Sequence, residues 1–193
     1  MADDVREPSK QTPSHPNDGE ASYNRARRAA MASKFAAVDR AKALRQEIPE
    51  PDKPFTPCHI FFYGSLMSPQ VLQTVAKLEN TPLTQKGIVK GFKIKMWGIY
   101  PAAIPCSDTV DTVAGTVWHV DEYSQLARLQ EYETGAYKLY ECEIEVEGGE
   151  KLSGSKMFCW AGEHDSPELE EGVFDFERYQ KYFMPSVIAA GTQ

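Results

Sequence analysis

The stretch His59-Ile60-Phe61-Phe62-Tyr63-Gly64-Ser65-Leu66-Met67-Ser68-Pro69 carries the signals of a strand, a tight turn and a helix start. Its apolar and aromatic run, residues 60–63, predicts a buried strand that ends at Gly64. Ser68 is a favourable N-cap, and Pro69 suits the first position of a helix. Apolar residues then recur at helical spacing. The stretch therefore predicts a buried strand that turns directly into a helix.

A corner of this kind is suited to hold an anionic group. Gly64 lets a ligand approach the backbone closely, and the N–H groups of the turn and of the helix end are available as donors. The same pattern is also typical of a plain strand-to-helix connection that binds nothing. The local sequence leaves both interpretations open.

The distribution of charge limits the classes of partner. The 193-residue chain is long enough for one domain and a tail, and it carries a net charge of −7. Residues 1–50 hold nine Lys/Arg against eight Asp/Glu, whereas the remainder holds twelve against twenty. An acidic body argues against nucleic acid as a partner, because that would need a basic face.

Hydropathy and cysteine spacing indicate the compartment. The sequence has no apolar run of about 18 residues and no apolar segment near Met1, so we expect neither a membrane partner nor a secretory signal. The four cysteines stand far apart without a C-x-x-C pair, which is typical of free thiols in a reducing compartment. The sequence therefore predicts a cytoplasmic protein.

Composition divides the chain into three segments. Residues 1–21 are polar and predict a disordered leader. Residues 22–57 begin with an alanine- and arginine-rich stretch that favours a helix and end in a proline-rich linker. Residues 58–193 form the predicted globular domain. The arginines of the second segment fit an exposed helix start better than a site for RNA or lipid.

Strand signals dominate the globular part, which favours an α+β fold around a small, partly closed sheet. The prolines of residues 97–105 predict an irregular apolar loop there, because proline is excluded from central strands. The other predicted elements are strands over 87–96 (bent at Gly91), 113–120, 137–146 and 156–160, and helices over 121–132 and 174–190, the last with a break at Pro185.

No pattern indicates a metal or a cofactor. The chain lacks H-E-x-x-H, a Walker loop and G-x-G-x-x-G, and its four histidines are scattered. Ser65 lies in G-S-L rather than in a G-x-S-x-G elbow, so we interpret it as a hydrogen-bonding group of the turn and not as a nucleophile.

Glu133 is a candidate general acid/base. It lies at the predicted end of a helix, between two tyrosines and just before Gly135, which we expect to supply the turn. Burial there would raise its pKa toward neutrality, as acid/base catalysis requires. The alternative is an ordinary surface glutamate. Glu131 is a rival acid, although it should point to a different face of the helix.

Three motifs in order resemble the gamma-glutamylcyclotransferase-like superfamily. They are Tyr63-Gly64-Ser65-Leu66, Tyr100-Pro101-Ala102, and the L-x-x-Y-E-x-x-x-Y run from Leu129 to Tyr137. Over about residues 58–185 the chain is similar to the branch of gamma-glutamylamine cyclotransferases and plant avirulence-induced proteins. The resemblance implies a small mixed β-barrel with flanking helices, and a cavity over the Y-G-S-L turn. Relatives often carry an arginine where this chain has Leu139.

The resemblance also implies site residues and a reaction. Glu133 would be the acid/base of a cofactor-independent reaction that converts a gamma-glutamyl amine or peptide to 5-oxoproline and a free amine. Tyr137 would contact the substrate or orient Glu133, or else belong to the core. The residues implied or proposed to bind the substrate are Tyr63, Gly64, Ser65, Leu66, Tyr100 and Tyr137.

Two other functions stay open. The same fold and glutamate could serve proton transfer, cyclisation or isomerisation of another small molecule in specialised metabolism, and a cavity lined by Met67, Trp97 and Tyr100 would favour this. The chain could instead be a non-catalytic adaptor that binds partners through residues 22–48. The N-terminal extension could also mediate a homodimer.

Overall fold

The computed structural model describes residues 54–107 and 110–191. The predicted leader, residues 1–21, and most of the predicted helix and linker, residues 22–57, lie outside the described residues. The adaptor segment 22–48 also lies outside them.

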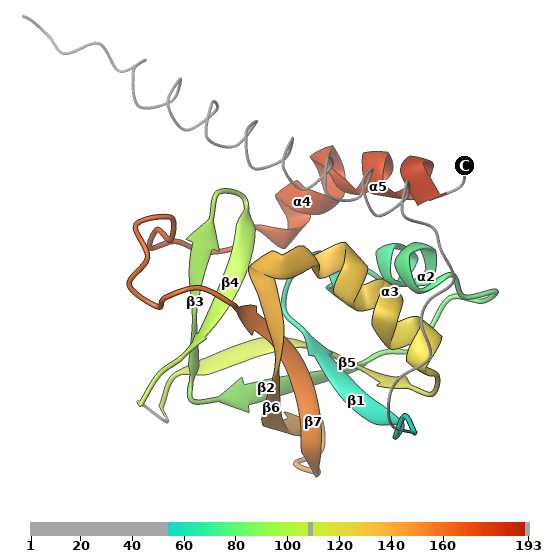
Figure 1. Ribbon diagram of the computed structural model, residues 1–193, viewed down its shortest axis with the longest axis horizontal. Helices are drawn as coiled ribbons and strands as arrows, with labels where there is room; N and C mark the ends of the chain where they lie inside the picture. Colours follow the sequence, from blue (N-terminus) through green and yellow to red (C-terminus); the bar gives the residue numbers. More distant parts are fainter. Residues whose placement is uncertain (1–53, 108–109, 192–193) are drawn as a thin grey trace, which may run out of the picture.

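Five strands close into a small barrel in the order β1-β5-β2-β6-β7 (Figure 1). β1 pairs with β7 in parallel, and every other neighbouring pair in the barrel is antiparallel. The predicted α+β fold with a mixed barrel is therefore confirmed, and the barrel is closed. Its strands are β1 (Cys58–Phe62), β2 (Gln85–Lys90), β5 (Thr112–Val120), β6 (Tyr137–Val146) and β7 (Lys151–Trp160).

Two further strands form a hairpin whose sheet is separate from the barrel. Two predictions about this region were wrong. β3 (Phe92–Trp97) is separated from β2 by Gly91, whose φ of 77° turns the chain away, so residues 87–96 are two strands rather than one bent strand. β4 (Tyr100–Pro105) pairs with β3, although a loop was expected. Its prolines are tolerated because both strands of a two-stranded sheet are edges.

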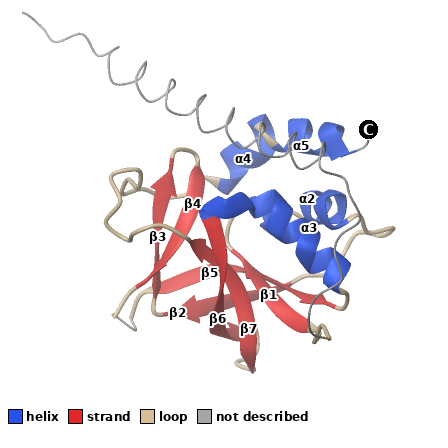
Figure 2. Cartoon of the chain, in the orientation of Figure 1, coloured by secondary structure: helices blue, strands red, loops and turns tan. Residues whose placement is uncertain are grey.

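The helices gather at one end of the barrel, as Figure 2 shows. They are η1 (Ser65–Met67), α2 (Pro69–Ala76), α3 (Tyr123–Glu133), η2 (Thr134–Ala136), α4 (Phe176–Tyr182) and α5 (Met184–Gly191). Ser68 caps α2, since its side chain accepts the N–H of Val71. The C-terminal helix breaks at Phe183 and not at Pro185, which lies in the first turn of α5 where a missing N–H is harmless. No helix in the described ranges is long and apolar enough to cross a membrane.

Two apolar clusters share strand β1 because its side chains alternate between faces. One cluster takes a residue from each barrel strand and so fills the barrel interior: Phe61, Val89, Val117, Ile144 and Met157. The other packs between the barrel and the helices, and it includes Ile60, Phe62, Leu72, Leu129 and Tyr179. The end of β1 is therefore held from both sides, which fixes where the following turn lies.

Gly115 allows β5 to pass close to the end of β1. A Cβ atom at this position would overlap the carbonyl oxygen of Phe62 and lie 2.7 Å from the Phe61 ring. We expect Gly115→Ala to lower the free energy of unfolding by about 1–3 kcal/mol, as overpacking does in other cores, measured by chemical denaturation.

The matched control is Gly135→Ala, because a Cβ atom there would meet nothing within 4 Å. Equal stability of the two variants would contradict the close approach of β1 and β5.

Candidate active site

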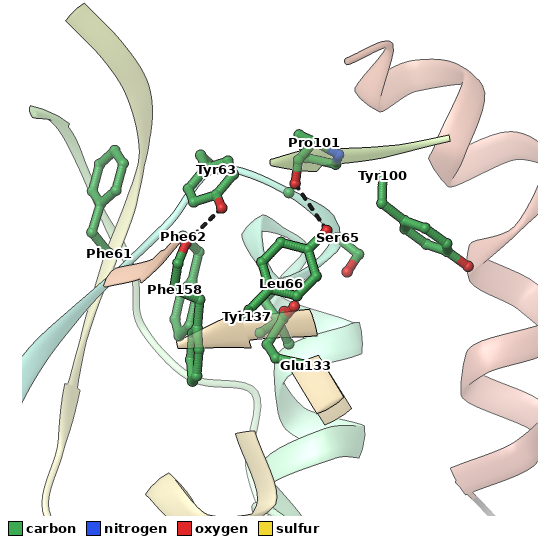
Figure 3. A pocket seen from close by; sticks show the side chains of 11 residues that line it. Phe61, Phe62, Tyr63, Ser65, Leu66, Tyr100, Pro101, Glu133, Tyr137 and Phe158 are labelled. Atoms are coloured by element: carbon green, nitrogen blue, oxygen red, sulfur yellow. Dashed lines mark hydrogen bonds between the residues drawn. The ribbon is translucent and has the colours of Figure 1, made fainter. Parts of the chain in front are cut away.

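One pocket brings together all seven residues that the sequence suggested for substrate binding or catalysis (Figure 3). The space between its lining atoms is about 350 Å³, part of it open to solvent. The full lining is Phe61, Phe62, Tyr63, Gly64, Ser65, Leu66, Tyr100, Pro101, Glu133, Tyr137 and Phe158. Glu133 is the one charged side chain among these lining residues.

The turn after β1 forms one wall of the pocket. Its backbone is tightened by two hydrogen bonds, from Met67 N–H to Gly64 O at 3.0 Å and from Ser68 N–H to Ser65 O at 3.2 Å. A Cβ atom at Gly64 would lie 3.1 Å from the Pro101 side chain, so glycine allows β4 to approach. Within the described part of the chain, the N–H groups of Ser65 and Leu66 make no hydrogen bond. The turn therefore offers donors at the pocket wall.

Two tyrosines of the lining tie the strands around the pocket together. The Tyr63 hydroxyl donates to Phe158 O at 2.5 Å and accepts the N–H of Ala103 at 3.0 Å. The Tyr137 hydroxyl donates to Pro101 O at 3.2 Å. Both hydroxyl hydrogens are thus directed at main-chain oxygens, and Figure 3 shows both bonds. In this structure the two side chains therefore line the pocket with their aromatic rings.

Glu133 is the last residue of α3 and is half-buried in the pocket wall. Its rival Glu131 is exposed and does not line the pocket. The sharp turn after the helix falls at Thr134, with φ 65° and ψ −174°, rather than at Gly135 as expected. A β-branched residue in this region is strained, because its Cβ atom crowds the backbone. That turn directs the chain from Glu133 into β6.

Four buried tyrosines and the half-buried Tyr132 lie near enough to the Glu133 carboxylate for its charge to affect their hydroxyls. Burial is the largest cause that raises the pKa of each hydroxyl, and the negative charge of Glu133 raises each pKa further. The five residues are Tyr63, Tyr100, Tyr132, Tyr137 and Tyr179. The carboxylate therefore sits among neutral hydroxyls and aromatic rings.

Sequence analysis did not single out Tyr132 and Tyr179 as site residues. Tyr132 stands directly before Glu133, and its hydroxyl lies 3.0 Å from the Ser65 Oγ atom. A signal for it was present in the L-x-x-Y-E motif. Tyr179 comes from α4, and nothing in its local sequence distinguishes it from an ordinary helical core residue.

An aromatic cluster supports the pocket from outside. The Trp97 ring lies 6.3 Å from the Tyr100 ring and 6.4 Å from the Tyr137 ring, measured between centroids. Its indole N–H donates to Glu168 at 3.2 Å. Neither Trp97 nor Met67 lines the pocket, so Tyr100 alone of the three proposed apolar residues does.

No group of side chains in the described ranges could hold a metal ion. The four cysteines are free thiols, as predicted. Burial is the largest cause that raises the pKa of Cys58, Cys142 and Cys159, so their thiols stay protonated.

Comparison with known families identifies one that matches the chain. The family described as "Gamma-glutamyl cyclotransferase, AIG2-like" matches residues 60–178, more than half of the chain. The chain belongs to this family. Every pocket residue named above lies within the matched range of the AIG2-like family. No curated protein sequence matches the chain closely enough to count as a relative.

Two solved structures share the fold of this AIG2-like chain. One is a solution structure from Arabidopsis thaliana with 23% identity and a TM-score of 0.52, matched over 72% of this chain and 90% of that chain. The second, also an Arabidopsis thaliana solution structure, has 22% identity and a TM-score of 0.53, matched over 73% and 83%. At these identities the likeness shows the fold alone.

The shielded tyrosines predict how the protein responds to alkali. They keep their protons in the folded state, whereas the unfolded chain loses them near the ordinary tyrosine pKa of 10.0. Because of this difference in protonation, the free energy of unfolding keeps its full value below pH 10 and falls as the pH rises beyond it. We expect the tyrosinate absorbance of these five residues to develop together with unfolding, measured by circular dichroism on the same samples. A tyrosinate signal from all nine tyrosines of the chain while the protein stays folded would contradict their burial.

Proposed function

We propose that the chain is a cofactor-independent cyclotransferase that cleaves a gamma-glutamyl amine or peptide into 5-oxoproline and a free amine. Glu133 is the proposed general acid/base. The observation that supports this most strongly is the meeting, in one pocket, of a single carboxylate and a turn with unused N–H donors. Membership of the AIG2-like family supports the reaction class.

The charges of the pocket fit a gamma-glutamyl group. The Glu133 carboxylate attracts the α-ammonium of the substrate, and no cationic side chain of the lining competes for it. The α-carboxylate then needs neutral donors, which the N–H groups of Ser65 and Leu66 in the turn after β1 supply. The α-ammonium and the α-carboxylate are bonded to the same carbon, so these two contacts orient the α-carbon, and the side chain must fold back to bring the gamma-carbonyl to the amine.

The reaction needs no nucleophile from the protein. Glu133 takes a proton from the α-ammonium, and the resulting amine attacks the gamma-carbonyl carbon to form a new C–N bond. The original amide C–N bond breaks as protons reach the leaving nitrogen through Glu133. Of the three ammonium protons, one stays on the lactam nitrogen and two leave with the departing amine, which is released as an ammonium ion. No water is consumed.

Orientation supplies much of the rate in this scheme. Attack and departure occur within one molecule, so a pocket that holds the substrate folded converts the reaction to ring closure. Rigid pocket walls help to hold the substrate folded. Here the hydrogen bonds of the Tyr63 and Tyr137 hydroxyls link three strands around the cavity. The aromatic lining also limits water at the reacting carbonyl.

The other enzymatic interpretation receives less support from the pocket. It would be favoured by a lining of Met67, Trp97 and Tyr100, but only Tyr100 is part of the lining. The adaptor interpretation concerns residues 22–48, which lie outside the described ranges, so it stays a separate prediction.

The decisive experiment measures 5-oxoproline release from a panel of gamma-glutamyl amines and dipeptides. We expect release by the wild type and a loss of about 100-fold or more in kcat/KM in Glu133→Gln, because a removed general acid/base typically costs 10²–10⁴-fold. The variant is nearly isosteric, so its thermal stability checks that the fold is retained.

Glu131→Gln is the matched control, because it removes the same charge two residues away on an exposed position outside the pocket. We expect its activity to equal that of the wild type. Activity that survives in Glu133→Gln, or that is lost equally in both variants, would contradict the role of Glu133. Absence of release from every substrate by the wild type would overturn the cyclotransferase proposal.

A further inference from the structure

The Tyr132 hydroxyl joins the end of helix α3 to the turn after β1. It lies 3.0 Å from the Ser65 Oγ atom, and the two residues are 67 positions apart in the chain. Tyr132 immediately precedes Glu133, the last residue of α3. Ser65 is the first residue of η1, is 5% exposed, and lines the pocket. One hydrogen bond therefore connects the helix end that carries the proposed acid/base to the turn that carries the N–H donors.

The end of α3 depends on such a connection because its own backbone is strained. Thr134, directly after Glu133, has a φ of 65°, where a β-branched residue is disfavoured. A strained turn persists only when the contacts around it hold it in place. On one side of this turn is the bond from Tyr132 to Ser65, and on the other is β6, which begins at Tyr137. We therefore expect the position of Glu133 to depend on the contacts of its neighbours.

The bond is available in either direction. The Tyr132 side chain packs against the apolar cluster between the barrel and the helices. Burial raises the pKa of its hydroxyl well above the ordinary value, so the group stays neutral and can either donate or accept a hydrogen bond. The Ser65 hydroxyl has the same two capacities. The connection therefore does not depend on which of the two oxygens is the donor.

We infer that Tyr132 is a positioning residue, whose hydrogen bond to Ser65 sets the distance between the Glu133 carboxylate and the N–H donors of the turn. This inference rests on the proposed function, since it assigns these two groups to the two charged groups of one substrate. For this role the Tyr132 hydroxyl neither touches the substrate nor transfers a proton.

The distance matters because one substrate has to meet both groups at once. The α-ammonium and the α-carboxylate are bonded to the same carbon, so the carboxylate of Glu133 and the N–H donors must be correctly spaced to hold both. Attraction between the ammonium and Glu133 tolerates a small shift, whereas proton transfer requires hydrogen-bond distance. A displacement of about 1 Å can lower the rate about 100-fold. Loss of the bond should therefore reduce kcat more than it weakens substrate binding.

The test is Tyr132→Phe, which keeps the ring and removes the hydroxyl, with 5-oxoproline release as the readout. We expect kcat to fall about 10-fold or more while KM changes by less than about threefold. Tyr123→Phe is the matched control. Tyr123 begins the same helix and is also half-buried, but it does not line the pocket and its ring contacts that of Phe55. We expect this control to change neither value.

A double-mutant cycle identifies the bond itself. Ser65→Ala removes the same bond from its other end, so kcat should fall in this variant too, which tests the inference even if Tyr132→Phe fails to fold. In the Ser65→Ala background, Tyr132→Phe should lower kcat by less than about twofold, because the bond is already lost. Equal falls in the two backgrounds would overturn the inference, because Tyr132 would then act without Ser65.

The pH profile of kcat separates positioning from other roles of the hydroxyl. If Tyr132 only places Glu133, the plateau of kcat falls in Tyr132→Phe, and the pH of half-maximal kcat stays at its wild-type value. A shift of that pH would overturn positioning, since the hydroxyl would then act on the protonation of the acid/base. A lower melting temperature with unchanged kcat per folded molecule would overturn it in favour of packing.

The outcomes also distinguish this inference from the proposed function. Release by the wild type, with Tyr132→Phe indistinguishable from Tyr123→Phe, overturns the positioning role alone. A rise in KM at unchanged kcat also overturns it, because the hydroxyl would then serve substrate binding. Absence of release by the wild type overturns the proposed function and this inference with it.

Discussion

The Tyr63 hydroxyl is the interaction on which the pocket depends. It donates to the main chain of β7 and accepts from the main chain of β4, while Tyr63 itself directly follows β1. It therefore joins the barrel to a hairpin that belongs to a different sheet. Together with the bond from the Tyr137 hydroxyl to Pro101 O, this connection fixes the wall that carries Tyr100 and Pro101 relative to the Y-G-S-L turn. Buried and shared between two partners, the hydroxyl is costly to remove.

The chemistry of the pocket follows from how little charge it contains. The lining holds one half-buried carboxylate whose charge acts on neutral tyrosines, and the turn after β1 offers peptide N–H groups. Such a site distinguishes a positive from a negative end of a ligand with a single ionised side chain. Few charges also mean that few have to be desolvated when the pocket fills.

The features of the structure that could be predicted from the sequence are those specified by residues close together in the chain. Ser68, Pro69 and the apolar run before Gly64 specify strand, turn and cap through short-range contacts, and the structure has all three. The β3–β4 hairpin was missed because its prolines are acceptable only at an edge, and edges are decided by which strands pair. Thr134 takes the strained turn that Gly135 was expected to make, and strain of this kind is not visible in local sequence preferences. Tyr179 reaches the site from a distant helix, which no local pattern indicates.

The parallel pairing of β1 with β7 has a consequence for how the protein folds. The two strands lie near opposite ends of the described chain, and the bond from Tyr63 to Phe158 spans 95 residues of sequence. Contacts of such long range form late, because the entropy of closing a large loop is lost before the contact is gained. Tyr63 and Phe158, which are joined by such a contact, both line the pocket. A chain emerging during synthesis therefore has no partial version of the site, and the pocket comes into existence only when the barrel closes.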